Sequence, residues 1–161
     1  MVQTEIERRW LLRKIPDNCK QLSRLEITQF YLEEENNIIR YRRTIGPEKE
    51  KIEYFKIIKK RVSGFTNTEE ILPINYEEFN QKRFFEGVTE ISKTRYIFYD
   101  EKQNLTFEID SFSQFTLSIL ELELTSEAQS FIIPEFISDH ILIEITGLKQ
   151  FSNYSLSLNK I

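Results

Sequence analysis

Residues 107–112 read Phe-Glu-Ile-Asp-Ser-Phe, so the carboxylates of Glu108 and Asp110 alternate with apolar side chains. Successive side chains of a β-strand point to opposite faces, and this spacing therefore predicts that Glu108 and Asp110 share one face of a strand. Like charges on one face repel each other, and folding alone does not require them. Four further segments repeat the spacing, with the pairs Glu5 and Glu7, Arg40 and Arg42, Lys93 and Arg95, and Glu121 and Glu123.

Positive and negative pairs occur in nearly equal number. If the strands share one sheet face, that face carries many charges of both signs. Such a surface suits a polyanion that is held by cations on one side and by a carboxylate-bound metal ion on the other.

Alternating segments separated by turn residues predict about nine strands, and most connections are too short for parallel crossovers, so the pairing is antiparallel. A helix is expected between Asn75 and Gly87, a short helix from Ser126 to Phe131, and an amphipathic segment over residues 150–159. The expected strands cover residues 4–11, 25–32, 37–44, 52–59, 66–72, 89–99, 104–112, 116–125 and 141–146.

So many strands in 161 residues predict a closed barrel in a single domain, residues 1–161. The like-charge pairs predict a polar interior, and the apolar alternates then face outward under a cover of helices. These alternates include Ile6, Tyr41, Phe107, Ile109 and Leu122.

Composition limits the class of partner. The net charge of −4 argues against a general nucleic-acid-binding protein but allows a local basic site for a small polyanion. No apolar run approaches the ~20 residues of a membrane span, so no membrane partner is expected. The N-terminus shows no signal peptide, and the single cysteine, Cys19, excludes an internal disulfide, which together predict a cytoplasmic protein.

The only histidine is His140, which excludes a metal site built on histidines and a histidine-based triad. A metal ion must therefore be held by oxygen ligands, and such ligands favour Mg²⁺ or Mn²⁺.

Several motifs occur in an order typical of one family. Glu5-Ile6-Glu7-Arg8-Arg9 is similar to a Glu-x-Glu-x-Lys signature, and the chain as a whole resembles the CYTH superfamily, also called triphosphate tunnel metalloenzymes. The other matching pieces are residues 29–32, Arg40-Tyr41-Arg42, Tyr54 to Lys59, Lys93-Thr94-Arg95-Tyr96, residues 107–112, Glu121-Leu122-Glu123, Glu144-Ile145-Thr146 and Phe151-Ser152-Asn153.

The resemblance implies a mostly β, α+β fold in which an eight-stranded antiparallel closed barrel surrounds a triphosphate, with a few covering helices. It implies phosphate-binding roles for Arg9, Arg40, Arg42, Lys59, Lys93, Arg95 and Lys149, and metal-binding roles for Glu5, Glu7, Glu121, Glu123 and Asp110. Supporting or orienting roles fall to Glu69, Glu108 and Glu144, and Glu108 and Asp110 are alternatively partners that orient cations.

Two departures from the family pattern concern catalysis. In hydrolase members the signature lysine pairs with a tyrosine and activates water; Tyr31 matches the tyrosine, but Arg9 stands at the lysine position. Arginine keeps its charge, so Arg9 can bind phosphate or orient a nucleophile but cannot relay a proton as a base. In the fifth strand, Asn67, Glu69 and Ile71 stand where the family often has Arg-x-Glu-x-Glu.

Three functions follow from the resemblance. The first is a metal-dependent triphosphatase acting on inorganic triphosphate or a small organic triphosphate. The second is an adenylate cyclase on the same scaffold, and the third is a tunnel that binds polyphosphate or nucleotide without turnover. The sequence leaves a monomer and a homodimer as alternatives, because Trp10, Phe30 and Phe65 could cover an interface or form a core.

Overall fold

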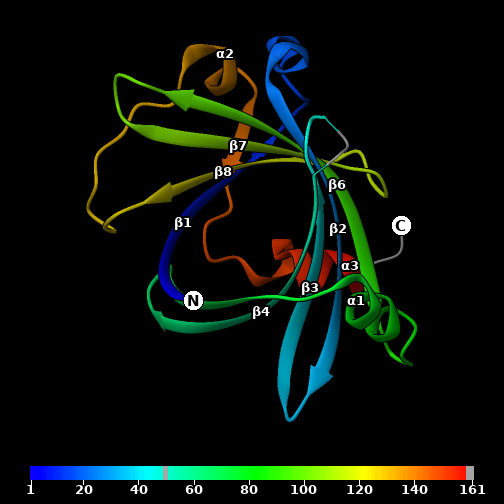
Figure 1. Cartoon of the computed structure of the whole chain (residues 1–161). Coiled ribbons are helices and arrows are strands. Elements are labelled where there is room, and N and C mark those ends of the chain that lie inside the picture. The colour runs from blue at the N-terminus through cyan, green and yellow to red at the C-terminus, as the bar shows by residue number, and fades with distance from the viewer. Residues whose placement is uncertain (49–50, 159–161) are drawn as a thin grey trace.

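Eight antiparallel strands form a closed barrel, and a ninth strand extends it at one edge (Figure 1). The computed structural model describes residues 1–48 and 51–158. The strands of the barrel are β1 (Val2–Leu12), β2 (Ser23–Glu34), β3 (Asn37–Ile45), β4 (Ile52–Ser63), β5 (Thr66–Pro73), β6 (Thr89–Asp100), β7 (Leu105–Phe112) and β8 (Ser118–Leu124), and the ninth strand is β9 (Ile141–Glu144).

The barrel closes through β1, which pairs with β8 along one edge and with β5 along the other. Residues 2–6 of β1 pair with residues 66–70 of β5, and residues 10–12 pair with β9 instead. The two strands β1 and β5 therefore separate after residue 6. The chain that follows β9 lies against β1 beyond this point, because Arg9 O accepts a hydrogen bond from Ile145 N at 2.8 Å.

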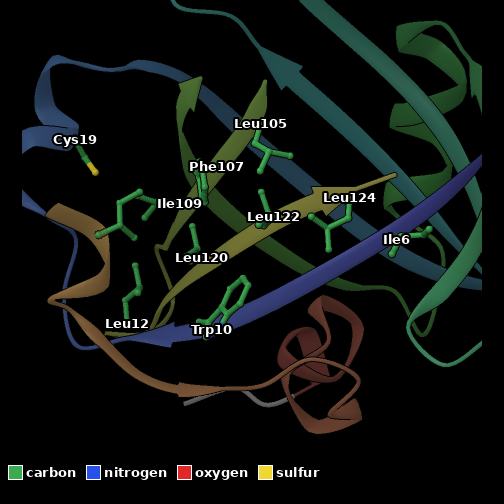
Figure 2. Close-up of a cluster of buried hydrophobic side chains, with 11 residues drawn as sticks. Ile6, Trp10, Leu12, Cys19, Leu105, Phe107, Ile109, Leu120, Leu122 and Leu124 are labelled. Atoms are coloured by element: carbon green, nitrogen blue, oxygen red, sulfur yellow. The ribbon is translucent and has the colours of Figure 1, made fainter. Parts of the chain in front are cut away.

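The apolar alternates of the strands face outward, as predicted, and most are buried under short helices and loops. One cluster on β1, β7 and β8 includes Ile6, Trp10, Phe107, Ile109 and Leu122 (Figure 2). The 3₁₀-helix η1 (Asp17–Gln21) and helix α2 (Glu135–Ser138) each contribute a residue to it, Cys19 and Ile137.

Helix α1 (Tyr76–Arg83) covers a second outward cluster on β2 and β3, where Phe79 packs against Phe30 and Tyr41. Asn75 caps this helix as predicted, since its Oδ1 accepts a hydrogen bond from Glu78 N at 2.9 Å. Trp10 and Phe30 are thus buried within the chain itself, at 6% and 0% exposure.

A third cluster is apolar and lies on the inward face, at the end where β1 and β7 finish and β6 and β8 begin. It includes Ile91, Phe112, Ile119 and Leu156. The 3₁₀-helix η2 (Lys149–Phe151) and helix α3 (Asn153–Leu158) supply its outer layer. The prediction of a polar interior thus holds for the middle of the barrel but not for this end.

The helix expected from Ser126 to Phe131 is wrong: these residues form turns and extended chain, and the helix begins after Pro134. The polar side chains of this segment bind backbone groups, one of them local and one distant in the sequence. Gln129 Oε1 accepts a hydrogen bond from Thr125 N at 2.7 Å, and Glu127 Oε1 accepts one from Phe65 N at 3.0 Å.

The expected amphipathic segment over 150–159 becomes η2 and α3 up to Leu158, and Asn159 lies outside the described residues. No helix in the described part of the chain is long and apolar enough to cross a membrane.

Candidate active site

The cross-strand register brings the predicted charged pairs together on the inward face. Arg9 lies opposite Glu121, and Arg95 lies opposite Asp110. Acidic residues also lie directly opposite each other, Glu7 with Glu123 and Glu108 with Glu121. Like charges at such positions are unfavourable, so an arrangement of this kind is expected where a bound ion compensates for the repulsion.

A pocket of about 330 Å³ opens beside the inward apolar cluster, between β3, β4, β5, β1 and the chain after β9. Four of the predicted phosphate-binding residues line it, and Tyr31 and Glu7 lie in the same wall. One further cation, Arg61, was not predicted, although Lys59 and Arg61 repeat the spacing of like charges that marked the other strands. The cations of the pocket are Arg9, Arg40, Lys59, Arg61 and Lys149.

Two of these cations carry donors that lack a partner. Arg9 Nε and Nη2 and Arg40 Nε are buried and have no hydrogen-bond partner in the described structure. Arg9 Nε lies 3.4 Å from both Glu7 Oε1 and Glu121 Oε1, and Arg40 Nη1 lies 3.8 Å from Glu69 Oε1. Buried donors without acceptors are costly, and an anion in the pocket would satisfy them.

The other predicted cations lie deeper in the barrel and bind protein groups. Asp110, which has no exposed surface, accepts hydrogen bonds from Lys93 Nζ at 2.6 Å and from Arg95 Nε at 2.7 Å. Arg95 also donates to Glu121 at 2.8 Å and forms an ion pair with Glu108. Asp110 and Glu108 thus occupy the geometry of partners that orient cations, the alternative role considered for them.

Arg42 is likewise held by protein, since its Nε donates to Gln29 Oε1 at 3.2 Å. The deep cations therefore form a scaffold, and the pocket cations are the ones available to a ligand.

Three carboxylates of the inward face, Glu5, Glu7 and Glu123, have a raised pKa. Burial, and then the carboxylates of Glu121 and Glu5, raise the pKa of Glu7 to about 8. Burial also raises the pKa of Glu5, which forms an ion pair with Lys59, and of Glu123. Arg95 and Lys93 reverse the effect of burial at Glu121 and hold its pKa well below the ordinary value.

This donor set fits a hard divalent cation. Its members are carboxylates, and Glu7 faces two other acids. A cation among them would offset both the cost of burying their charges and the repulsion between them. Among residues 1–48 and 51–158 no three acidic, histidine or cysteine side chains are already gathered at ligating positions. The residues thus match the chemistry of such an ion without a preformed coordination shell.

The predicted catalytic pair, Arg9 and Tyr31, lines one pocket but is not joined by a hydrogen bond in the described part of the chain. The Tyr31 hydroxyl accepts from Gln29 Nε2 at 2.7 Å. Arg9 Nη1 donates to the carbonyl oxygen of Phe151 at 2.7 Å. The Arg40 guanidinium lies 5.8 Å from the centre of the Tyr31 ring, within reach of a cation–π contact.

The remaining predicted residues divide between the interior and the outer surface. Glu69 faces the interior, as its contact with Arg40 shows. Asn67, one of the departures from the family pattern, keeps a polar contact at its position, because its Nδ2 donates a hydrogen bond to Glu5 Oε2 at 3.4 Å. Glu144 does orient an arginine, but this arginine is the outward-facing Arg8, at 2.7 Å.

Comparison with known proteins agrees with this geometry. The inorganic triphosphatase NE1496 is 29% identical over 96% of this chain and 95% of its own, with a TM-score of 0.62. The PH1819 protein of Pyrococcus horikoshii OT3 is 17% identical over 77% of this chain and 80% of its own, with a TM-score of 0.55. A putative adenylate cyclase of Bacillus halodurans is 16% identical over 78% and 83%, with a TM-score of 0.52.

No family model and no curated protein matches the chain. The closed barrel carries cations and carboxylates on its inward face, and this arrangement is typical of a tunnel-type protein. The structural neighbours, which include an inorganic triphosphatase and a putative adenylate cyclase, support the resemblance of the chain to the CYTH superfamily of triphosphate tunnel proteins.

Proposed function

We propose that the chain is a divalent-metal-dependent triphosphatase that acts on inorganic triphosphate or a small organic triphosphate. One observation carries this proposal: five cations line a single pocket, and two of them present buried donors that have no hydrogen-bond partner among the described residues. Similarity to an inorganic triphosphatase supports the same activity.

Arg40, Lys59 and Arg61 bind the phosphate oxygens in this proposal, and Lys149 closes the cationic ring from the chain after β9. Hydrolysis of a phosphoanhydride is accelerated mainly by positioning and by neutralisation of charge that develops on phosphate oxygens. Arginine forks fix the orientation of the chain of phosphates as well as its charge. The deep network of Lys93, Arg95 and Asp110 keeps the surrounding strands in register.

Mg²⁺ or Mn²⁺ would be held by Glu5, Glu7, Glu121 and Glu123. When bound, such an ion neutralises charge on the phosphate oxygens and lowers the pKa of a water molecule. Glu7 would supply its carboxylate by releasing the proton that burial makes it retain. Arg9 and Arg95, which contact Glu121, orient one of these ligands.

A second candidate function is a tunnel that binds a triphosphate without turnover. The observation in its favour is the separation of Arg9 and Tyr31, which bind Phe151 and Gln29 instead of each other. Arg9 also cannot act as a base.

The experiment that decides is phosphate release from inorganic triphosphate with Mg²⁺ and then Mn²⁺. Lys59→Met is compared with Lys60→Met, because Lys59 lines the pocket whereas Lys60, its neighbour on β4, is exposed. We expect wild type and Lys60→Met to release phosphate and Lys59→Met to lose most of this activity.

Tight binding of triphosphate with no release in any metal would instead establish the second function. Formation of cyclic AMP from ATP would establish cyclase chemistry. Equal activity of Lys59→Met and wild type would contradict the pocket as the site.

A further inference from the structure

The chain that follows β9 forms one wall of the pocket. Six of the pocket residues belong to residues 147–154, here called the C-terminal segment, and Lys149 and Asn153 are two of its polar members. Asn153 Oδ1 is buried and has no hydrogen-bond partner in the described part of the molecule. The position of this segment therefore decides whether the pocket exists in its observed form.

Arg9 of the barrel hydrogen-bonds this segment through its side chain. Its Nη1 donates to the carbonyl oxygen of Phe151 at 2.7 Å. Its backbone holds the residues just before the segment, because Arg9 N donates to Thr146 Oγ1 at 2.9 Å and Arg9 O accepts from Ile145 N at 2.8 Å. One residue of β1 thus fixes both the start and the middle of this wall.

The same guanidinium also reaches the ligand side of the pocket. Arg9 is 8% exposed, it lines the pocket, and its Nε and Nη2 have no hydrogen-bond partner among the described residues, although Nε forms ion pairs with Glu7 and Glu121. A guanidinium has five N–H donors in a planar fork and can serve a carbonyl and an anion at once. A lysine presents one compact ammonium group on a flexible stem, and a phosphate would draw it away from Phe151.

We infer that Arg9 is a positioning residue: it holds the C-terminal segment against the pocket through Phe151 while its free edge faces the bound phosphate. The inference rests on the proposed function for the identity of the anion, but the contact with Phe151 is independent of it. Arginine at the signature position then has a role of its own in this chain, because it holds the C-terminal segment, and is not merely the loss of a lysine.

The segment has other attachments, so loss of this contact loosens the segment without unfolding the barrel. Tyr154 packs edge-on against Tyr31, with ring centres 5.3 Å apart. Phe151, Tyr154 and Leu156 belong to the inward apolar cluster. The substitution Arg9→Lys keeps the positive charge and is therefore a test of position and not of charge.

Two measurements on the full chain test the inference, with Arg8→Lys as the matched control. Arg8 is the next residue on β1 and faces outward, where it binds Glu144. The first measurement is hydrogen exchange of the Phe151 and Ser152 amides, which donate to Leu148 and Lys149. The second is the dependence of phosphate release on the concentration of inorganic triphosphate.

We expect Arg9→Lys to speed exchange of these amides about fivefold, since one hydrogen bond is lost. We expect the KM for triphosphate to rise roughly tenfold while kcat changes less than about twofold. Arg8→Lys should change neither quantity. If Arg9→Lys does not fold, the same two measurements are made on Arg9→Gln, whose side chain is polar but too short to reach Phe151.

Unchanged exchange in Arg9→Lys would overturn the inference, and so would faster turnover than wild type. If wild type releases no phosphate, the proposed triphosphatase activity fails, whereas the exchange measurement still decides the role of Arg9.

Discussion

The substitution Asp110→Asn tests the deep ionic network. Asp110 has no exposed surface and receives hydrogen bonds from Lys93 Nζ at 2.6 Å and from Arg95 at 2.7 and 2.8 Å. Asparagine keeps the shape but removes the charge and replaces one acceptor by a donor. Arg95 retains Glu121 and Glu108, so the loss falls mainly on Lys93, whose side chain is also fully buried.

Breaking one side of a buried ion pair typically costs about 3–5 kcal/mol. Lys93 can relieve part of this cost by releasing its proton, because burial and the neighbouring Arg95 already lower its pKa to about 8. We therefore expect a loss near the lower end, about 3 kcal/mol, which corresponds to a fall in Tm of about 6–12 °C for a chain of this size.

Urea denaturation followed by circular dichroism measures this loss. Glu144→Gln is the control, because the Arg8–Glu144 pair has a similar distance of 2.7 Å but lies on the surface, where such a pair contributes about 1 kcal/mol or less. A loss below about 1 kcal/mol for Asp110→Asn would refute the reasoning, since the network would then add no more than a surface ion pair.

Three further predictions concern single side chains. Arg40→Ala should weaken triphosphate binding by about 1.5–3 kcal/mol, measured by calorimetry, because it removes a charge-assisted contact. Glu7→Gln should raise the Mg²⁺ concentration that is needed for half-maximal activity about tenfold or more, and an unchanged metal titration would contradict its assignment as a ligand. Burial alone would raise the pKa of Glu34, but hydrogen bonds from Lys82, Tyr41 and Lys56 lower it to about 2, against an ordinary value of 4.5. Its contribution to stability is therefore present above about pH 4.5 and lost as the pH falls toward 2, so the difference in urea midpoint between wild type and Glu34→Gln should shrink over that window.

The alternation of residues was sufficient to predict the inward face of the barrel. Five like-charge pairs at i and i+2 predicted which side chains face the interior, and the register confirms the shared face. The helix cap at Asn75 followed from local chemistry that needs no tertiary partner. The resemblance to a known family supplied the ligand class, which alternation alone does not specify.

The apolar end of the interior escaped prediction because only the charged residues were followed. Leu11 lies two residues after Arg9, Ile119 two before Glu121, and Phe112 two after Asp110. Each therefore continues the same inward row, and the rows end together at one end of the barrel under the C-terminal segment.

The bond between Arg9 and Phe151 could not be predicted, because it joins residues 142 positions apart through a backbone carbonyl. Every residue has a backbone carbonyl, so the residue types do not reveal which carbonyl accepts the hydrogen bond. The false helix at Ser126 has a similar cause: the tertiary contact of Glu127 with Phe65 and a non-helical local bond between Gln129 and Thr125 override the capping signal.

The partners of β1 also determine when the molecule can be completed during synthesis. Strand β1 pairs with residues 66–70, 118–124 and 141–144, all of which are synthesised after it. The edge that pairs with β8 stays unpaired until most of the chain has been translated. Such distant pairing makes folding slow and exposes nascent chains to aggregation. The pocket can be completed only after Lys149 and Asn153, which belong to its last wall in sequence order, have been synthesised. Newly made chains therefore depend on protection from self-association for longest at the strand that carries Glu7 and Arg9.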